Sequence, residues 1–265
     1  MTTPAASLYP TPATPAKPAA LWEDFVDIFT QPAAVFERRR DGRFWAALIA
    51  FTVVSVLALF AARPVIQPAL ERQMSAQIAK VSADPNMSAE QREAITSRMR
   101  GAADSPWALA AGAVFLPFML FLVALTLWLV AKPFGSGASL GQAMAVTAIA
   151  GIPRAVLGLA VAGVSAAMGR QVEQMQAITL GPAAFLGAEA SPVTAALLGR
   201  FDLGVLWHTV LLGIGIALMG RVVHRADAPP AIDGTIPRRS GLLAAAIVWA
   251  LGSLMAVVQA FNQAA

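Results

Sequence analysis

The sequence predicts an all-α integral membrane protein: a bundle of five transmembrane helices with a polar helical hairpin between the first and second spans. Hydrophobic residues make up 57% of the 265 residues, whereas charged residues make up only 13%. A soluble domain carries roughly a quarter charged residues. The charges also cluster between five long apolar runs. Because these runs are too long and too numerous to hide in one soluble core, lipid is the expected solvent.

Residues 1–20 contain five prolines set among alanine and threonine, so we expect a disordered tail. The tail lacks a basic region followed by an apolar one, which argues against a cleavable signal peptide. Residues 21–42 are expected to form amphipathic interfacial helices, because Trp22, Phe25 and Phe29 recur at helical spacing opposite acidic residues. A helix this short needs a surface to hold it, and two remain open: its own bundle or the lipid surface.

The membrane domain is expected over residues 43–265. Its spans are predicted at residues 44–62, 107–130, 138–168, 203–220 and 242–261, against a bilayer core of about 30 Å. Arg63 and Pro64 are expected to end the first span, and Pro117 to kink the second. The third run is longer than a bilayer requires, so a kink is expected at residues 151–154.

The segments between the spans are polar or rich in turn residues. Residues 64–105 predict a helical hairpin outside the bilayer, with a break at residues 84–86 and a capping box from Ser88 to Gln91. A tight turn is expected at residues 132–137, a second loop at residues 169–201, and a short basic connection at residues 221–239.

The basic residues near the span ends predict the orientation. With a cytoplasmic amino terminus, nine lie inside: Arg38, Arg39, Arg40, Arg43, Lys132, Arg221, Arg225, Arg238 and Arg239. Five lie outside: Arg63, Arg98, Arg100, Arg170 and Arg200. This excess favours a cytoplasmic amino terminus and an external carboxyl terminus. We therefore expect a multi-pass protein with this orientation, and the Ala-, Gly- and Arg-rich composition indicates the inner (cytoplasmic) membrane of a bacterial cell.

The composition also argues against several classes of function. The chain has no cysteine and two histidines, so no metal site is expected. It contains no Gly-x-Ser-x-Gly, no His-Glu-x-x-His and no phosphate-binding glycine loop. We therefore predict no catalytic, cofactor-binding or metal-binding residue, and no enzyme. The formal charge of +4 does not indicate nucleic acid, because the basic residues flank apolar runs.

Three polar residues fall inside or beside the spans and form the candidate intramembrane polar site: Arg154, Asp202 and His208. A charge at the position of Arg154 costs about 2.5 to 3.5 kcal/mol, so it needs a partner or a wet cavity, and Asp202 is the best candidate partner. The alternative, which the length of the third run favours, is that Arg154 snorkels to lipid phosphate. His208 is expected to hydrogen-bond a neighbouring helix or lie in the headgroup zone.

Small residues four apart, at residues 137–141 and 163–167, predict two helix-packing seams. Four further features lie in a characteristic order: Phe29-Thr-Gln-Pro32 followed by Phe36, Gly151-Ile-Pro153, Phe201-Asp202 through Trp207, and Arg238-Arg-Ser-Gly before a span containing Trp249. In these features residues 21–262 resemble the Yip family, polytopic proteins named for interaction with Ypt/Rab GTPases, and its prokaryotic members in particular. The resemblance implies a five-helix membrane domain with a cytoplasmic amino terminus.

Two functions remain open. The first is a non-enzymatic membrane scaffold or partner-binding protein, which would contact the lipid bilayer and either a protein partner or further copies of itself. Its docking surfaces would be the amphipathic amino-terminal segment and the 64–105 hairpin. The second is a small-solute or ion pathway, or a transporter accessory subunit, lined by Arg154, Asp202 and His208.

Overall fold

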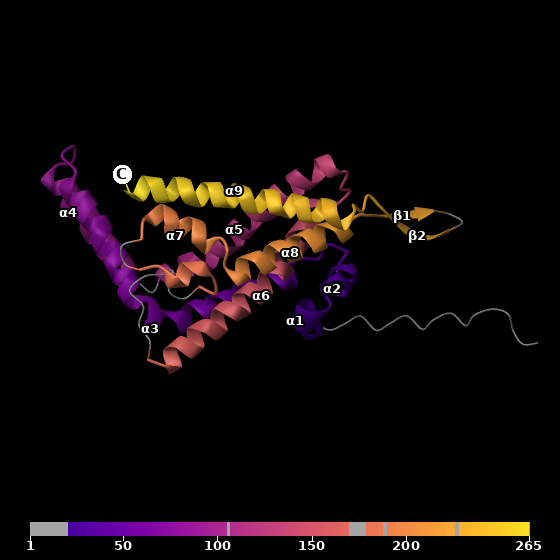
Figure 1. The fold of residues 1–265 in the computed structure, drawn as a ribbon, viewed down its shortest axis with the longest axis horizontal. Coiled ribbons are helices and arrows are strands. Elements are labelled where there is room, and N and C mark those ends of the chain that lie inside the picture. The colour runs from indigo at the N-terminus through magenta and orange to yellow at the C-terminus, as the bar shows by residue number, and fades with distance from the viewer. Residues whose placement is uncertain (1–20, 105–106, 170–178, 188–189, 226–227, 265) are drawn as a thin grey trace, which may run out of the picture.

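A computed structural model describes residues 21–104, 107–169, 179–187, 190–225 and 228–264. The expected disorder of residues 1–20 lies outside this part of the chain. Helices make up most of the fold, and Figure 1 shows their order. They are α1 (Leu21–Thr30), α2 (Pro32–Arg38), α3 (Trp45–Ala83), α4 (Ala89–Asp104), α5 (Trp107–Ala131), η1 (Lys132–Phe134), α6 (Leu140–Ala167), η3 (Pro182–Phe185), α7 (Pro192–Gly199), α8 (Leu203–Leu218) and α9 (Arg238–Ala264). Between α8 and α9, β1 (Arg221–Arg225) and β2 (Ala228–Asp233) form an antiparallel hairpin that the sequence did not predict.

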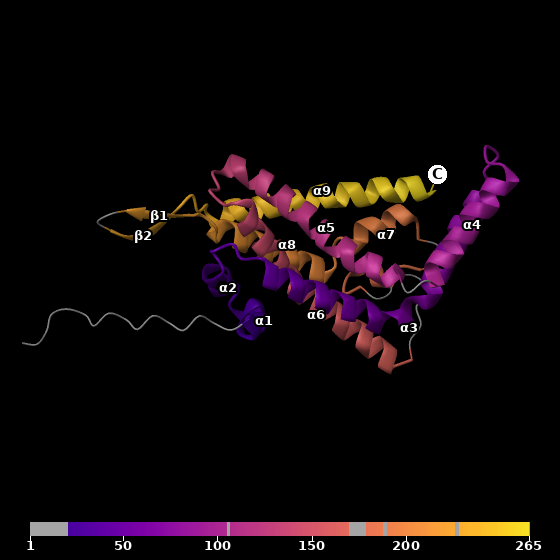
Figure 2. The ribbon, with the colours of Figure 1, turned by 180° about the vertical axis from the view of Figure 1, so that it is seen from behind.

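The long helices form a bundle, and the shorter elements lie at its two opposite ends (Figures 1 and 2). One end holds α1, α2 and the β1–β2 hairpin. The other end holds α7, the carboxyl terminus and α4, which projects away from the bundle. We call residues 70–104, the last part of α3 together with α4, the arm.

The prediction of an all-α membrane protein is confirmed. Four described helices are long and apolar enough to cross a bilayer: α3, α5, α6 and α9. Large apolar side chains stay exposed along these helices, as Ile49 and Val53 do on α3, and hydrocarbon is the solvent that suits them. α7 and α8 are bent by 48° relative to each other, and they make a fifth span when the pair is counted as one crossing. The sequence predicted the helix at residues 203–220, which α8 matches, but it placed residues 192–199 in a loop, where the structure has α7.

The helix that contains the first span does not end at Arg63 and Pro64, where the sequence predicted its end. α3 runs on for 39 residues with Pro64 and Pro68 inside it. A proline inside a helix costs about 3 kcal/mol, because it removes a backbone hydrogen bond and crowds the preceding turn. Val65 and Ile66 are almost fully buried in a small cluster with Ala162 of α6. This burial offsets the cost of the prolines and holds the base of the arm against the bundle.

α3 and α6 run parallel with a constant offset in sequence. Gly42 approaches Gln142, Phe51 lies against Gly151, and Ala62 packs in the same cluster as Ala162. Each pair is 100 residues apart, because 142 − 42, 151 − 51 and 162 − 62 are equal. Gly151 therefore leaves room for the Phe51 ring. The helix also continues through Pro153 without a break, in the region where the sequence predicts a kink.

The core lies where α6 and α8 meet, and small residues bring the helices together. A Cβ atom added to Gly213 of α8 would lie 2.8 Å from the Cα of Leu242 in α9. Gly137, in one predicted seam, touches Gly234 through a 2.8 Å backbone hydrogen bond. In the other predicted seam, Gly163 has no atom within 4 Å of its Cβ position. That glycine therefore makes no helix contact in the described chain.

Candidate functional site

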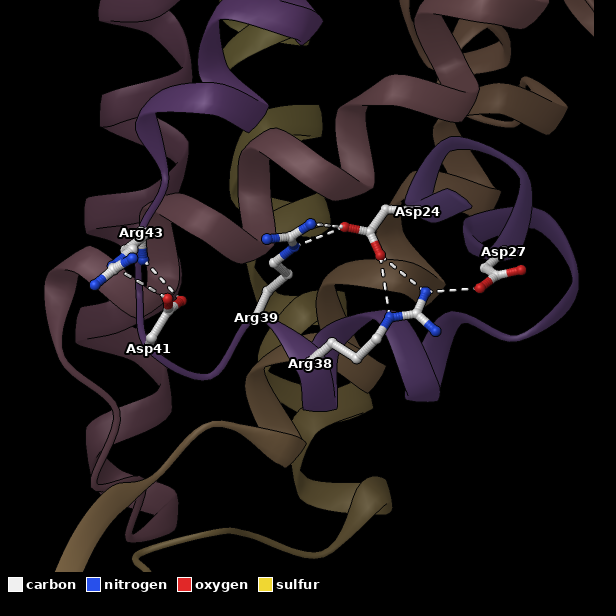
Figure 3. Close-up of polar contacts among 6 residues, drawn as sticks. All are labelled: Asp24, Asp27, Arg38, Arg39, Asp41 and Arg43. Carbon is white, nitrogen blue, oxygen red and sulfur yellow. Dashed lines mark hydrogen bonds and ion pairs between the residues drawn. The ribbon is translucent and has the colours of Figure 1, made fainter. Parts of the chain in front are cut away.

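At the amino-terminal end, one carboxylate joins two arginines (Figure 3). Asp24 of α1 accepts hydrogen bonds from Arg38 Nη2 at 2.8 Å and from Arg39 Nε at 2.6 Å. Arg38 also donates to Asp27 at 2.7 Å. The Asp24 side chain is only 7% exposed. Burying its charge would be costly, and the hydrogen bonds from the two arginines to its two oxygens offset that cost. We call these four residues the clamp.

The local sequence brings the clamp together across a short turn. Gln31 donates its backbone N–H to the Asp27 carbonyl, and Pro32 begins α2 at a position that needs no N–H donor. α1 and α2 therefore fold back on each other, and the end of α2 reaches the start of α1. Burial lowers the pKa of Arg38, but hydrogen bonds and the charges of Asp27 and Asp24 outweigh it and raise that pKa above its ordinary value.

The two faces of α1 have different surroundings. Ile28 is fully buried in the main core, beside Phe36 of α2. On the other side, Trp22 is 68% exposed, and Val26 and Phe29 are exposed as well. The sequence left open whether this segment packs on the bundle or lies on lipid. One face packs on the bundle, and the other presents an apolar stripe to the surroundings.

The linker after α2 is tied to the ends of two spans. Gln142 at the start of α6 donates from Nε2 to the carbonyls of Arg40 and Gly220, at 2.8 Å each. Arg40 donates from Nε to the Leu218 carbonyl at 3.0 Å. Gln142 also forms a capping box with Ser139. Sequence reasoning missed these ties, because it treated the arginines only as topology signals, although Ser-Leu-Gly-Gln was a readable capping pattern.

A cavity of about 530 Å³ opens beside the clamp, between α1, the linker, α3 and α6. Its polar lining is Asp24, Arg39 and Arg43. Its apolar lining comes from Phe25, Phe44, Trp45, Ala46, Ala47, Ala50, Ile149 and Ile152. We call it the linker cavity. Charged side chains and apolar side chains thus line the same space.

The structure brings Arg154 and Asp202 into one cavity of about 230 Å³ near the bend between α7 and α8. Arg154 Cγ and Asp202 Oδ1 lie 3.3 and 3.0 Å from the Cβ position of Gly204. Within the described residues, however, the two charged groups form no ion pair. Asp202 instead caps α8 by accepting from the Val205 N–H at 3.1 Å and also accepts from the Leu180 N–H at 2.6 Å.

His208 does not line this cavity. Its Nδ1 atom is buried and has no hydrogen-bond partner in the described part of the chain. Arg154 lies 14 residues into α6 and Asp202 lies 16 residues before the end of α8. At 1.5 Å per residue, both lie about 21 to 24 Å from the linker end of the bundle, beyond the middle of a bilayer core.

The bend itself is fastened to α9, which the sequence did not predict. Arg200 donates from Nε to Ser253 Oγ at 3.1 Å, and Trp249 Nε1 donates to the Arg200 carbonyl at 3.1 Å. Phe201 stands edge-on to the Trp249 ring at 5.4 Å. The Trp249 bond satisfies the Arg200 carbonyl, one of the backbone groups that a break in a membrane helix leaves without a helical partner. The Phe201 and Trp249 motifs therefore meet in space.

The described residues contain no group of three or more histidine or carboxylate side chains that could hold a metal ion. What the chain offers is paired charge, apolar walls and exposed helix faces. A family model described as the Yip1 domain matches residues 26–232. Comparisons with curated proteins and with solved structures found no match. The matched region runs from α1 to β2 and covers more than three-quarters of the chain, so this protein belongs to the Yip1-domain family of membrane proteins.

Proposed function

We propose that this protein is a non-enzymatic membrane scaffold that binds a protein partner through the arm. The observation that carries this proposal is the continuity of α3, which leaves the bundle and becomes the first helix of the arm without a break. A partner held by the arm is thereby fixed relative to the membrane spans. The buried cluster of Val65, Ile66 and Ala162 supports the base of the arm.

Few apolar residues pack between the two helices of the arm. Met74, Ile78 and Val81 recur at helical spacing on α3 and are half-buried, as are Ile95 and Met99 of α4. The outward positions between them are exposed. A helix pair with so small an apolar contact is marginal in water. A partner on the outward faces would stabilise it by binding the folded form.

The charge distribution supports opposite locations for the two ends. The excess of basic residues at the linker end favours placing α1 and α2 on the cytoplasmic face of the inner membrane. The arm would then lie outside. The protein would present one docking surface on each side of the bilayer, the apolar stripe of α1 inside and the arm outside.

A solute or ion pathway through Arg154 and Asp202 is the second candidate, and the cavity that they share is the observation in its favour. Between this cavity and the linker end, Ala148, Leu211 and Ile216 are fully buried where α6 packs on α8. A closed contact of this kind favours the scaffold. Replacement of Arg154 by alanine would abolish flux in reconstituted vesicles if the pathway existed.

Site-specific photo-crosslinking tests the scaffold. A photoreactive side chain at the exposed positions Ala79 or Ser97 should give an adduct of one defined mass in intact cells. The same group at Ile78 or Ile95, which face the other helix, is the matched control and should give little. The mass distinguishes another protein from a second copy of this chain. Equal adducts at all four positions, or none at the exposed pair, would contradict the proposal.

A further inference from the structure

We propose that the linker cavity binds one anionic phospholipid, with an acyl chain between its apolar walls and the phosphate at Arg43. The proposal concerns a lipid site at the end of the bundle opposite the arm, and it does not depend on the scaffold role. Its volume of about 530 Å³ lies within the range of about 300 to 1,000 Å³ that is common for ligand sites.

The order of residues along the cavity matches the order of groups in a phospholipid. Arg39 and Arg43 lie just before the first apolar run, at the level where headgroups are expected. Trp45, Ala47 and Ala50 follow on α3, and six residues of helix from Phe44 to Ala50 descend about 9 Å into hydrocarbon. A charged headgroup would therefore lie beside the two arginines, and an acyl chain would lie beside the apolar residues of α3.

The charges of the lining favour an anion. Both oxygens of Asp24 are already engaged by Arg38 and Arg39, so this carboxylate contributes little free negative charge. Arg43 is 89% exposed, and its contact with Asp41 is an exposed ion pair at 3.4 Å. Such surface pairs are worth little, so Arg43 can exchange this partner for a phosphate at small cost. Basic pockets beside membrane helices bind anionic headgroups in this way.

The cavity also adjoins a surface that faces lipid. Trp45 lines the cavity and is 66% exposed, and Ile49 and Val53 continue the exposed apolar strip along α3. The walls are wide because alanines stand at positions 46, 47 and 50, where larger side chains would fill the space. A phospholipid can therefore enter the cavity laterally, from the membrane leaflet that faces this strip of α3.

Native mass spectrometry of the full-length protein in mild detergent tests this inference. Delipidated protein is titrated with phosphatidylglycerol, with phosphatidylcholine and with glycerol phosphate. We expect one tightly bound phosphatidylglycerol and at least about fivefold weaker binding of phosphatidylcholine, since each basic residue near an anionic surface contributes about 1 kcal/mol. Binding of glycerol phosphate as tight as that of phosphatidylglycerol would show a free-phosphate site and overturn the proposal.

Two pairs of variants test the contact with the headgroup and the contact with the acyl chain separately. Arg43→Gln should weaken binding of phosphatidylglycerol about fivefold, whereas Arg63→Gln, at an exposed arginine near the middle of α3, should not. Ala46→Phe, at the exposed rim of the cavity, should reduce binding of both lipids at least tenfold. Ala58→Phe, about three turns further along α3 and away from the cavity, should change neither. Unchanged lipid binding in both Arg43→Gln and Ala46→Phe would overturn the proposal.

Discussion

Replacing Gly241 by alanine should separate α8 from α9. A Cβ atom at Gly241 would meet the carbonyl oxygen of Gly213 and would lie 2.7 Å from the Cβ of Ala217. Both obstacles are backbone or the first side-chain atom, so neither can rotate away. The helices must therefore move apart by several tenths of an ångström, against closely packed side chains that include the fully buried Leu211 and Ile216.

The size of the effect follows from two opposing terms. Overpacking a close contact costs about 1 to 3 kcal/mol. Alanine in a helix regains up to about 1 kcal/mol relative to glycine. With the middle of the overpacking range, about 2 kcal/mol, the net loss is about 1 to 2 kcal/mol and should lower the Tm by about 2 to 8 °C for a chain of about this size. The six tryptophans allow the transition to be followed by intrinsic fluorescence in detergent.

Gly163 provides the matched control. It also lies inside a helix, but nothing stands within 4 Å of its Cβ position. Gly163→Ala should therefore keep or slightly raise the Tm, because only the helix propensity changes. If Gly241→Ala proves as stable as Gly163→Ala, the close approach of α8 and α9 does not limit stability and the reasoning fails.

Three further predictions concern polar contacts. Asp24→Asn removes the charge shared by two arginines and should cost about 1 to 3 kcal/mol; hydrogen exchange should rise in α1 and α2 and stay unchanged in α9, whereas a uniform rise would contradict a local clamp. Gln142→Leu removes the two hydrogen bonds to the Arg40 and Gly220 carbonyls and should lower the free energy of unfolding by about 1 to 3 kcal/mol. Amide hydrogen exchange should become faster in the linker, and Gln67→Leu, at an exposed position of α3, is the control. Asp202→Ala removes the α8 cap and should cost about 1 to 2 kcal/mol; a Tm equal to that of the original protein would show that the cap is dispensable.

Much of the membrane architecture could be predicted, because the length of an apolar run is a local property of the chain. The helix break before Met87, the Ser88–Gln91 capping box and the turn after Lys132 were also readable for the same reason. Each depends on residues within a few positions of one another.

The failures concern contacts between distant segments. Pro64 is a reliable local signal for the end of a helix, but α3 continues because Val65 and Ile66 pack on α6, about 100 residues away. The bend between α7 and α8 is likewise fixed by Arg200 and Trp249, which are 49 residues apart. The charges at residues 38–40 were interpreted one by one as topology signals. The pairing of Arg38 and Arg39 with Asp24 required knowing that α1 folds back on α2.

The constant offset between α3 and α6 limits how the first span can slide. A shift of α3 along its axis by one turn, about 5.4 Å, would remove Phe51 from the space left by Gly151. It would also pull Gly42 away from Gln142 and Val65 out of its cluster at the far end. A force that moved the arm along this axis would therefore strain contacts at both surfaces of the membrane together.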